Sequence, residues 1–105
     1  MTILKKTDMR IINQGRLADF AVNHVDSVKA LNKWAKTLSI SNFKQPRDLL
    51  KEFPSADYVG NDRYIFDIKG NRYRIIAIVV FNGGIVDIRF VGTHAEYSKI
   101  NSKTI

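Results

Sequence analysis

Apolar and polar positions alternate most regularly in the last third of the chain, where they predict neighbouring β-strands. Residues 63–69 mix polar and apolar side chains, residues 75–81 form a continuous apolar run rich in β-branched side chains, and residues 85–91 mix the two again. The turn-forming pairs Gly70-Asn71 and Asn82-Gly83 separate these runs. Runs joined by such short turns are typical of β-hairpins. We therefore predict an antiparallel meander with residues 75–81 as its central, buried strand.

Two-residue turns at both places would fix the register of the meander and assign each side chain to a face. The expected opposite pairs are Asp67–Arg74, Ile65–Ile76, Ile78–Asp87, Arg74–Val91 and Arg72–Thr93. Because side chains alternate between faces with a period of two, one face is apolar and should pack against helices. Its members are Tyr64, Phe66, Ile68, Tyr73, Ile75, Ala77, Val79, Val86, Ile88 and Phe90. The other face is positively biased above an apolar floor, and its members are Arg63, Asp67, Lys69, Arg72, Arg74, Asp87, Arg89 and Thr93, with Ile65, Ile76 and Ile78 between them.

That assignment depends on the second turn, since a three-residue loop there would move the last strand to the opposite face.

Helical spacing dominates the first half of the chain, and Trp34 falls on an apolar helix side, so we expect it in the core. Asp26 or Ser27 can cap that helix through a side-chain oxygen. The predicted elements are an edge strand at 9–13, helices at 16–24, 28–38 and 46–52, a strand at 56–60, the meander, and a last helix at 94–100 capped by Thr93 and Glu96.

Length and composition place these elements in one domain. A chain of 105 residues supports a single hydrophobic core, so we predict an α+β domain over 1–105 with helices on one face of the meander, a leader at 1–8 and a tail at 101–105. The absence of cysteine excludes disulfides and thiolate metal sites and fits a reducing cytoplasm. The longest apolar run is too short to cross a membrane. A net charge of +7 favours a polyanionic partner, either nucleic acid or an acidic protein.

Few residues offer chemistry. No carboxylate or histidine cluster has metal-binding spacing, so we expect no metal and no other cofactor. His94 and Tyr97 lie three positions apart on the predicted last helix, and the meander brings Arg74 near them. Metal-free RNA cleavage needs a base for the 2′-hydroxyl, an acid for the 5′-oxygen and cations for the developing charge, which a histidine and an arginine can supply. Alternatively, His94 only caps the helix, Tyr97 only packs, and Arg74 only pairs with Asp67.

Three segments resemble the HigB family of type II toxins, which lies within the wider RelE superfamily. They are residues 53–60, 66–74 and 88–97, and the motifs Lys69-Gly-Asn-Arg-Tyr-Arg74 and Gly92-Thr-His-Ala-Glu-Tyr97 are the most specific. The resemblance covers roughly residues 9–100. It implies a RelE-like fold whose sheet face cleaves mRNA, usually on the translating ribosome. It also implies a helix-turn-helix antitoxin, HigA, which neutralises the toxin and represses the shared operon, so operator DNA would be met only through the antitoxin complex.

The family's functional residues transfer one at a time. Arg74 matches the arginine of the Tyr-Arg strand motif, His94 the Thr-His motif, and Tyr97 the aromatic residue of the last segment, so these three are predicted to be catalytic. The predicted RNA-binding residues are Arg63, Lys69, Asn71, Arg72 and Arg89. The sequence departs from the family pattern in two places. Ile65 and Asp67 occupy positions where some RelE members carry catalytic lysines, and Lys69 is a candidate replacement for one of them. Ser98 stands where HigB-like chains often carry aspartate. The alternatives are a non-catalytic RNA- or ribosome-binding module, an inactive toxin homologue, or a protein-interaction domain.

Overall fold

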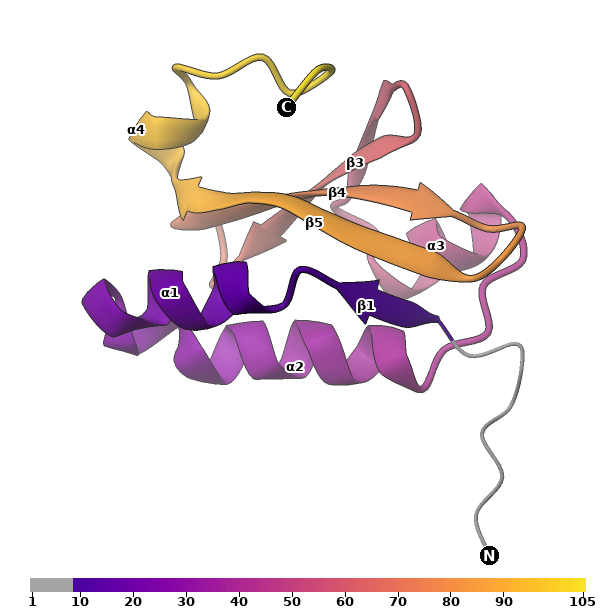
Figure 1. Cartoon of the computed structure of the whole chain (residues 1–105), viewed down its shortest axis with the longest axis horizontal. Helices are drawn as coiled ribbons and strands as arrows, with labels where there is room; N and C mark the ends of the chain where they lie inside the picture. Colours follow the sequence, from indigo (N-terminus) through magenta and orange to yellow (C-terminus); the bar gives the residue numbers. More distant parts are fainter. Residues whose placement is uncertain (1–8) are drawn as a thin grey trace, which may run out of the picture.

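The computed structural model describes residues 9–105, so the leader predicted at 1–8 lies outside the described residues. The predicted α+β class is confirmed, with helices preceding the sheet and a short helix following it (Figure 1). In chain order the elements are β1 (Arg10–Ile12), α1 (Gly15–Asn23), the single 3₁₀ turn η1 (Val25–Ser27), α2 (Val28–Ser39), α3 (Pro46–Glu52), β2 (Asp57–Gly60), β3 (Arg63–Ile68), β4 (Tyr73–Val80), β5 (Ile85–Thr93) and α4 (His94–Tyr97).

The sheet has five strands in the order β1-β5-β4-β3-β2. Strands β2 to β5 pair antiparallel, which confirms the predicted meander and adds β2 at one edge. Strand β1 lies at the other edge, as predicted, but pairs parallel with β5, with Arg10 opposite Ile85. The apolar run in 75–81 lies in β4, the middle strand of the sheet. A strand with neighbours on both sides and a covered face buries nearly all of its side chains, which explains why this run is apolar throughout.

The hydrophobic core lies between the sheet and α1, α2 and α3. Trp34 is only 3% exposed, as its helical spacing predicted, and its ring meets Phe66 of β3 edge-on. The main contributors from the helices are Leu17, Leu31, Trp34, Leu38 and Leu49, and those from the strands are Tyr64, Phe66, Ile68, Tyr73, Ile75, Ala77, Val79, Val86 and Ile88. All of the strand members were predicted to face the helices, because the period-two pattern puts them on the same side of the sheet.

The predicted register holds between β3 and β4, where Asp67 lies opposite Arg74. Between β4 and β5 it begins as predicted, with Ile78 opposite Asp87, but the register then shifts by one residue between Ile76 and Ala77. Such a β-bulge places an extra residue, here Arg89, in one strand of the pair.

Beyond the bulge, the predicted pairs of β4 and β5 are wrong. Arg74 lies opposite Gly92 rather than Val91, and Thr93 lies opposite Tyr73 rather than Arg72. The shift exchanges two side chains between the faces: Val91 packs against the helix-side core, and Phe90 lies opposite Ile76 on the other face. The prediction failed because a strict alternation allows no extra residue.

Of the two predicted helix caps, the one at the start of α4 is confirmed and the one at the start of α2 is wrong. Thr93 accepts from the Glu96 amide, and the Glu96 carboxylate accepts from the Thr93 amide, which is the predicted capping box. The α4 helix nevertheless ends at Tyr97, earlier than predicted. At α2 the predicted cap is wrong: the Ser27 hydroxyl donates to the His24 carbonyl 2.6 Å away.

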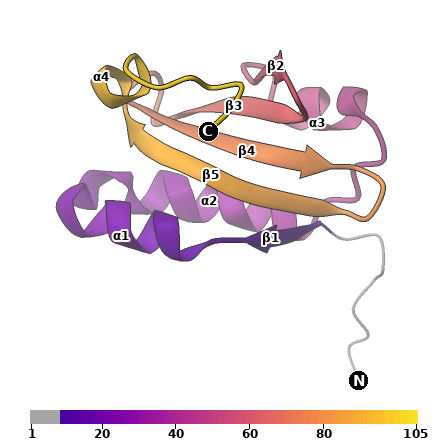
Figure 2. The same cartoon turned by 45° about the horizontal axis from the view of Figure 1, so that its top comes forward.

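The face that points away from α1 and α2 is also covered. Helix α4 and the segment 98–105 lie over this face (Figures 1 and 2). Beneath them Ile65 is 6% exposed and Ile76 is fully buried, so part of the predicted apolar floor is a second, smaller core. No helix within residues 9–105 has the length and apolar character needed to span a membrane.

Candidate active site

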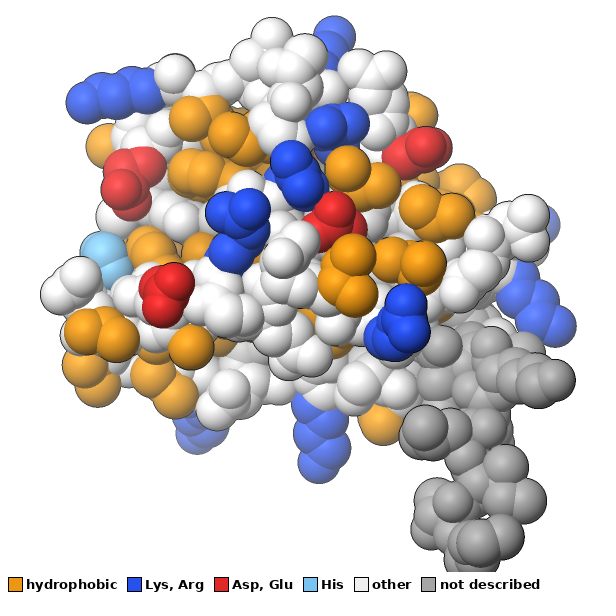
Figure 3. Space-filling model, in the orientation of Figure 1, with side chains coloured by type: hydrophobic (Ala, Val, Ile, Leu, Met, Phe, Trp, Pro, Cys, Tyr) orange, Lys and Arg blue, Asp and Glu red, His pale blue; other side chains and the backbone are white. Residues whose placement is uncertain are grey.

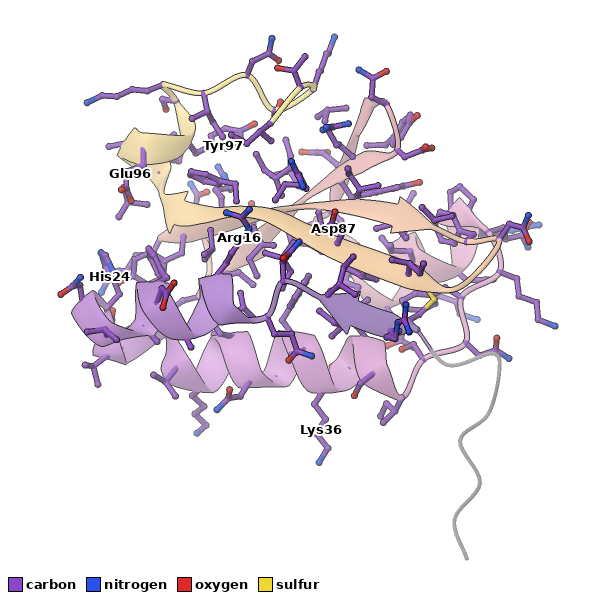
Figure 4. The ribbon with its side chains drawn as sticks, viewed as in Figure 1. Arg16, His24, Lys36, Asp87, Glu96 and Tyr97 are labelled. Carbon is purple, nitrogen blue, oxygen red and sulfur yellow. The ribbon has the colours of Figure 1, made fainter. Side chains whose placement is uncertain are left out.

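Arg74, Tyr97 and His94 come together on this second face. Arg74 on β4 donates a hydrogen bond to the carboxylate of Asp67 on β3. Its guanidinium carbon lies 5.4 Å from the centre of the Tyr97 ring, which is within cation–π range. The His94 ring lies 6.3 Å from the Tyr97 ring, nearly edge-on. Figure 4 shows Tyr97 on the sheet side of α4. We call these four residues the face cluster.

His94 is exposed at the first position of α4, where the Thr93 capping box fixes the start of the helix. Ser98, one turn later, places its hydroxyl 3.5 Å from the His94 Nδ1 atom and 2.9 Å from the His94 carbonyl oxygen. The serine found where HigB-like chains often carry aspartate therefore still lies beside the imidazole. The Thr93 amide lowers the pKa of Glu96, so the capping carboxylate is charged over a wider pH range.

Arg63 and Arg89 form a second pair of cations on the same face. Both donate to the carbonyl oxygen of Ile105, from Arg63 Nε and Nη2 at 3.1 and 2.7 Å and from Arg89 Nε at 3.4 Å. Arg89 also lies 3.4 Å from the Asp87 carboxylate, which accepts from Asn13 at 2.6 Å. The predicted tail at 101–105 thus folds back over the sheet. Figure 3 shows lysine and arginine side chains gathered on this side of the molecule, among apolar ones.

Lys69 and Arg72 turn toward the helix layer instead of sharing the face of Arg74. Their ammonium and guanidinium groups lie 3.3 and 2.9 Å from the Asp26 carboxylate in η1. The reason is the turn itself: Lys69 and Gly70 both have positive φ, 53° and 67°, which takes Lys69 out of the strand's alternation. The placement of Lys69 and Arg72 on the cationic face was therefore wrong. Both side chains remain accessible, at 41% and 61%, and Asn71 is exposed beside them.

Asp26 is the residue of this region that the sequence pattern missed, since it was predicted only as a helix cap. It accepts from the Tyr73 hydroxyl at 2.6 Å as well as from Lys69 and Arg72. The Tyr73 hydroxyl, with the two cations, lowers the pKa of Asp26 from 3.8 to about 2, and the same bond raises the pKa of Tyr73. The Tyr73 ring in turn meets His24 edge-on, 5.5 Å away. We call Asp26, Lys69, Arg72 and Tyr73 the turn cluster.

Phe90 is a second residue that the sequence pattern misplaced. A Cβ atom at residue 92 would collide with its ring, so Gly92 lets the ring lie flat along β5. The glycine two positions after an aromatic residue is the signal that could have revealed this. Beside Phe90 is an open hollow of about 430 Å³ lined by Arg16, Asp19, Phe20, Arg89, Phe90, Val91 and Ile105. Figure 4 shows Arg16 on the side of α1 that faces β5.

The face cluster and the Arg63–Arg89 pair together offer cations, an aromatic ring and an imidazole to one exposed surface. Within residues 9–105, no three His, Asp or Glu side chains are grouped closely enough to hold a metal ion. Guanidinium groups bind phosphate by paired hydrogen bonds, and rings bind bases by stacking. The arrangement therefore suits the backbone of a single-stranded polyanion.

Comparison with known proteins gives consistent matches. Residues 27–100 match the family model described as HigB_toxin, RelE-like toxic component of a toxin-antitoxin system. The chain is 35% identical over 92 residues to the "mRNA interferase toxin HigB" of Escherichia coli strain K12, covering 85% of this chain and 88% of that protein. It is 27% identical over 94 residues to the "mRNA interferase HigB" of Escherichia coli O6:H1, covering 88% and 91% respectively.

Proposed function

This chain belongs to the HigB family of RelE-like toxins, and we propose that it is an mRNA interferase, the toxin of a type II toxin–antitoxin system. The observation that carries the proposal is the convergence of Arg74, Tyr97 and His94 on one sheet face, where His94 is exposed and the Arg74 side chain is 14% exposed. These residues come from the two most specific sequence motifs, which lie on different elements.

In the proposed reaction the RNA supplies its own nucleophile. A base removes the proton of a 2′-hydroxyl, that oxygen attacks the adjacent phosphorus, and the bond to the 5′-oxygen breaks as an acid protonates it. His94 is exposed, and an imidazole can accept or donate a proton, so it can move one of these protons. Arg74 holds the phosphate as negative charge develops.

The ion pair with Asp67 suits Arg74 to this role. A guanidinium carries five N–H donors, so the bond to Asp67 leaves donors for a phosphate while it fixes the plane of the group. The Tyr97 ring holds the guanidinium from another side. We expect Tyr97 to act through this contact, and it also offers a surface for a nucleotide base.

The remaining cations place the RNA. Arg63 and Arg89 lie on the same face as Arg74, and Lys69, Asn71 and Arg72 lie at the turn of the β3–β4 hairpin. Contacts of this kind go mainly to phosphates and give position rather than sequence specificity. We propose that mRNA follows this path, with the ribosome as the platform on which it is presented, in the cytoplasm.

A cognate HigA-like helix-turn-helix antitoxin completes the proposal. It would neutralise the toxin, and operator DNA would be contacted only through the toxin–antitoxin complex. The proposed reaction needs no cofactor, because the 2′-hydroxyl of the RNA is the nucleophile.

The ends of the cleaved RNA test this proposal. Induced expression without the antitoxin should arrest growth and truncate mRNAs. Attack by the 2′-hydroxyl leaves a cyclic phosphate or 3′-phosphate and a free 5′-hydroxyl, which end-specific ligation and sequencing can identify. Products with 5′-phosphates would instead require an activated water and would overturn the mechanism.

One observation favours a second function. Arg74 is already paired with Asp67, as expected of a stabilising contact in a non-catalytic RNA- or ribosome-binding module. That reading predicts growth arrest without RNA cleavage, and arrest that persists in a folded double variant, Arg74→Ala with His94→Ala.

A further inference from the structure

Arg63 and Arg89, on two different strands, direct three N–H groups at one oxygen atom. That atom is the backbone carbonyl oxygen of Ile105, at 2.7 to 3.4 Å from the donors. Two guanidinium groups on one acceptor is an arrangement suited to a phosphate, because bonds between charged partners are about twice as strong as neutral ones.

Few contacts hold the segment 101–105 in place. The Asn61 side chain donates to the Lys103 carbonyl at 3.0 Å, and within the segment the Asn101 side chain accepts from the Lys103 amide at 3.0 Å. These bonds lie at the surface, and the segment carries no helix or strand. Segments with few buried contacts open at low free-energy cost. In Figures 1 and 2 the segment crosses the sheet face near β3 and β4.

We propose that residues 101–105 are an intramolecular occupant of a phosphate-binding subsite formed by Arg63 and Arg89, and that a backbone phosphate of RNA displaces them. The inference rests on the proposed function and adds a regulatory contact to it. Displacement gives the same three N–H donors a phosphate oxygen in place of the main-chain oxygen of Ile105. Ile105 also lines the hollow beside Phe90 and Arg16, so its departure opens space for the neighbouring nucleotide.

The segment should therefore reduce the apparent affinity for RNA. A site that is covered most of the time binds more weakly in proportion to the fraction that is open. A segment that covers the pair in about nine of ten molecules would lower affinity about tenfold.

Two variants release the segment in different ways. Deletion of residues 101–105 removes the occupant together with the charge of Lys103. Asn61→Gly removes the donor to the Lys103 carbonyl without a charge change, and glycine suits the positive φ of 51° at this position. Asn82→Gly, at the exposed β4–β5 turn, is the matched control.

The measurement is the dissociation constant for a single-stranded RNA with 2′-O-methyl groups throughout, which cannot be cleaved by 2′-hydroxyl attack. We expect Asn61→Gly and the deletion to bind up to about tenfold tighter than the unaltered chain, and Asn82→Gly to bind equally. In an Arg63→Ala, Arg89→Ala background the deletion should have no effect. Hydrogen exchange at residues 103–105 should rise when this RNA is added to the full chain.

Equal or weaker binding by both tail variants would overturn the inference, as would an absence of binding by every variant. The cleavage assay separates this result from the fate of the proposed function. A chain that cleaves RNA while its tail variants bind unchanged refutes the inference alone. A chain that shows the tail effect but never cleaves refutes the nuclease and leaves the tail contact standing.

Discussion

The turn cluster and the face cluster lie on the same β3–β4 hairpin, and each joins arginine to a carboxylate and a tyrosine. In the turn cluster Asp26 comes from the link between α1 and α2, and it accepts from Tyr73, Arg72 and Lys69. In the face cluster the carboxylate of Asp67 comes from the neighbouring strand, and within residues 9–105 it forms an ion pair only with Arg74.

The difference teaches which cations join the hairpin to the helix layer and which is oriented within the sheet face: Arg72 is 61% exposed, whereas Arg74 is 14% exposed. Asp26 binds donors across two layers, so it joins the hairpin to the helices. Asp67 binds within one layer, so it orients Arg74 and leaves the guanidinium beside the open surface where His94 lies. Sequence spacing cannot distinguish the two cases, because Arg72 and Arg74 are two residues apart in the same motif.

The largest difference should appear in catalysis. Losing a proton-transfer group typically costs on the order of 10²–10⁴-fold in rate, and losing a donor that stabilises transition-state charge costs about 10²–10³-fold. His94→Ala and Arg74→Ala should therefore each abolish growth arrest. Single-turnover RNA cleavage measures the loss, and unchanged thermal unfolding shows that the fold is intact. The matched variant Arg72→Ala should keep the rate of the chemical step within a few-fold. Equal losses in Arg72→Ala and Arg74→Ala would erase the distinction between the clusters.

The second difference should appear in stability as a function of pH. The pKa of Asp26 lies at about 2 in the folded chain and near 3.8 ordinarily, so the charged carboxylate stabilises the fold above pH 4 and loses this effect as the pH falls toward 2. Asp26→Asn should therefore lower the melting temperature at neutral pH, and the gap from the unaltered chain should shrink between pH 4 and pH 2. Asp57→Asn, an exposed carboxylate on β2, is the control. A gap that is constant with pH would contradict the role of Asp26.

The third test asks whether the turn cluster also binds RNA. Arg72 is 61% exposed, and each neutralised phosphate contributes a slope of about 0.7 to the salt dependence of binding single strands. Arg72→Ala should weaken binding to all RNA sequences alike and reduce the slope by about that amount. An unchanged slope would assign Arg72 to the fold alone.

The smallest effect is expected at Tyr97. Its ring contacts Arg74, and Tyr97→Phe keeps the ring while removing the hydroxyl. The cleavage rate of Tyr97→Phe should fall by only a few-fold. Tyr97→Ala should lose more, because the contact between the ring and Arg74 disappears; such contacts are worth about 0.5–1 kcal/mol at exposed sites. A loss in Tyr97→Phe as large as that in His94→Ala would show that the hydroxyl transfers a proton.

Much of this fold follows from local patterns in the sequence. Helical spacing located Trp34 in the core, alternation located the apolar sheet face, and the short turn at Gly70-Asn71 gave the β3–β4 register. The bulge at Arg89 did not follow, because a strict period-two alternation allows no extra residue in β5. In the folded chain the Phe90 ring lies directly over Gly92, where a Cβ atom would collide with it.

The candidate site was predictable as far as its motifs extend. Arg74, His94 and Tyr97 lie together because strand and capping rules place them at adjacent element ends. The partner of Arg72 was not predictable, since Asp26 lies far away in the sequence and looks like an ordinary helix cap. Nor was the fold-back of residues 101–105, whose polar composition resembles any exposed tail.

The parallel pairing of β1 with β5 has a consequence for the order in which the molecule assembles. Hairpins β3–β4 and β4–β5 join neighbours in the chain and can form early, whereas Arg10 must find Ile85 across nearly the whole domain. Contacts of such separation bear the full cost of closing a long loop before they gain anything. We expect β1 to dock last. Substitutions at Ile11 should then mainly accelerate unfolding and leave the folding rate almost unchanged, because the strand is absent from the transition state.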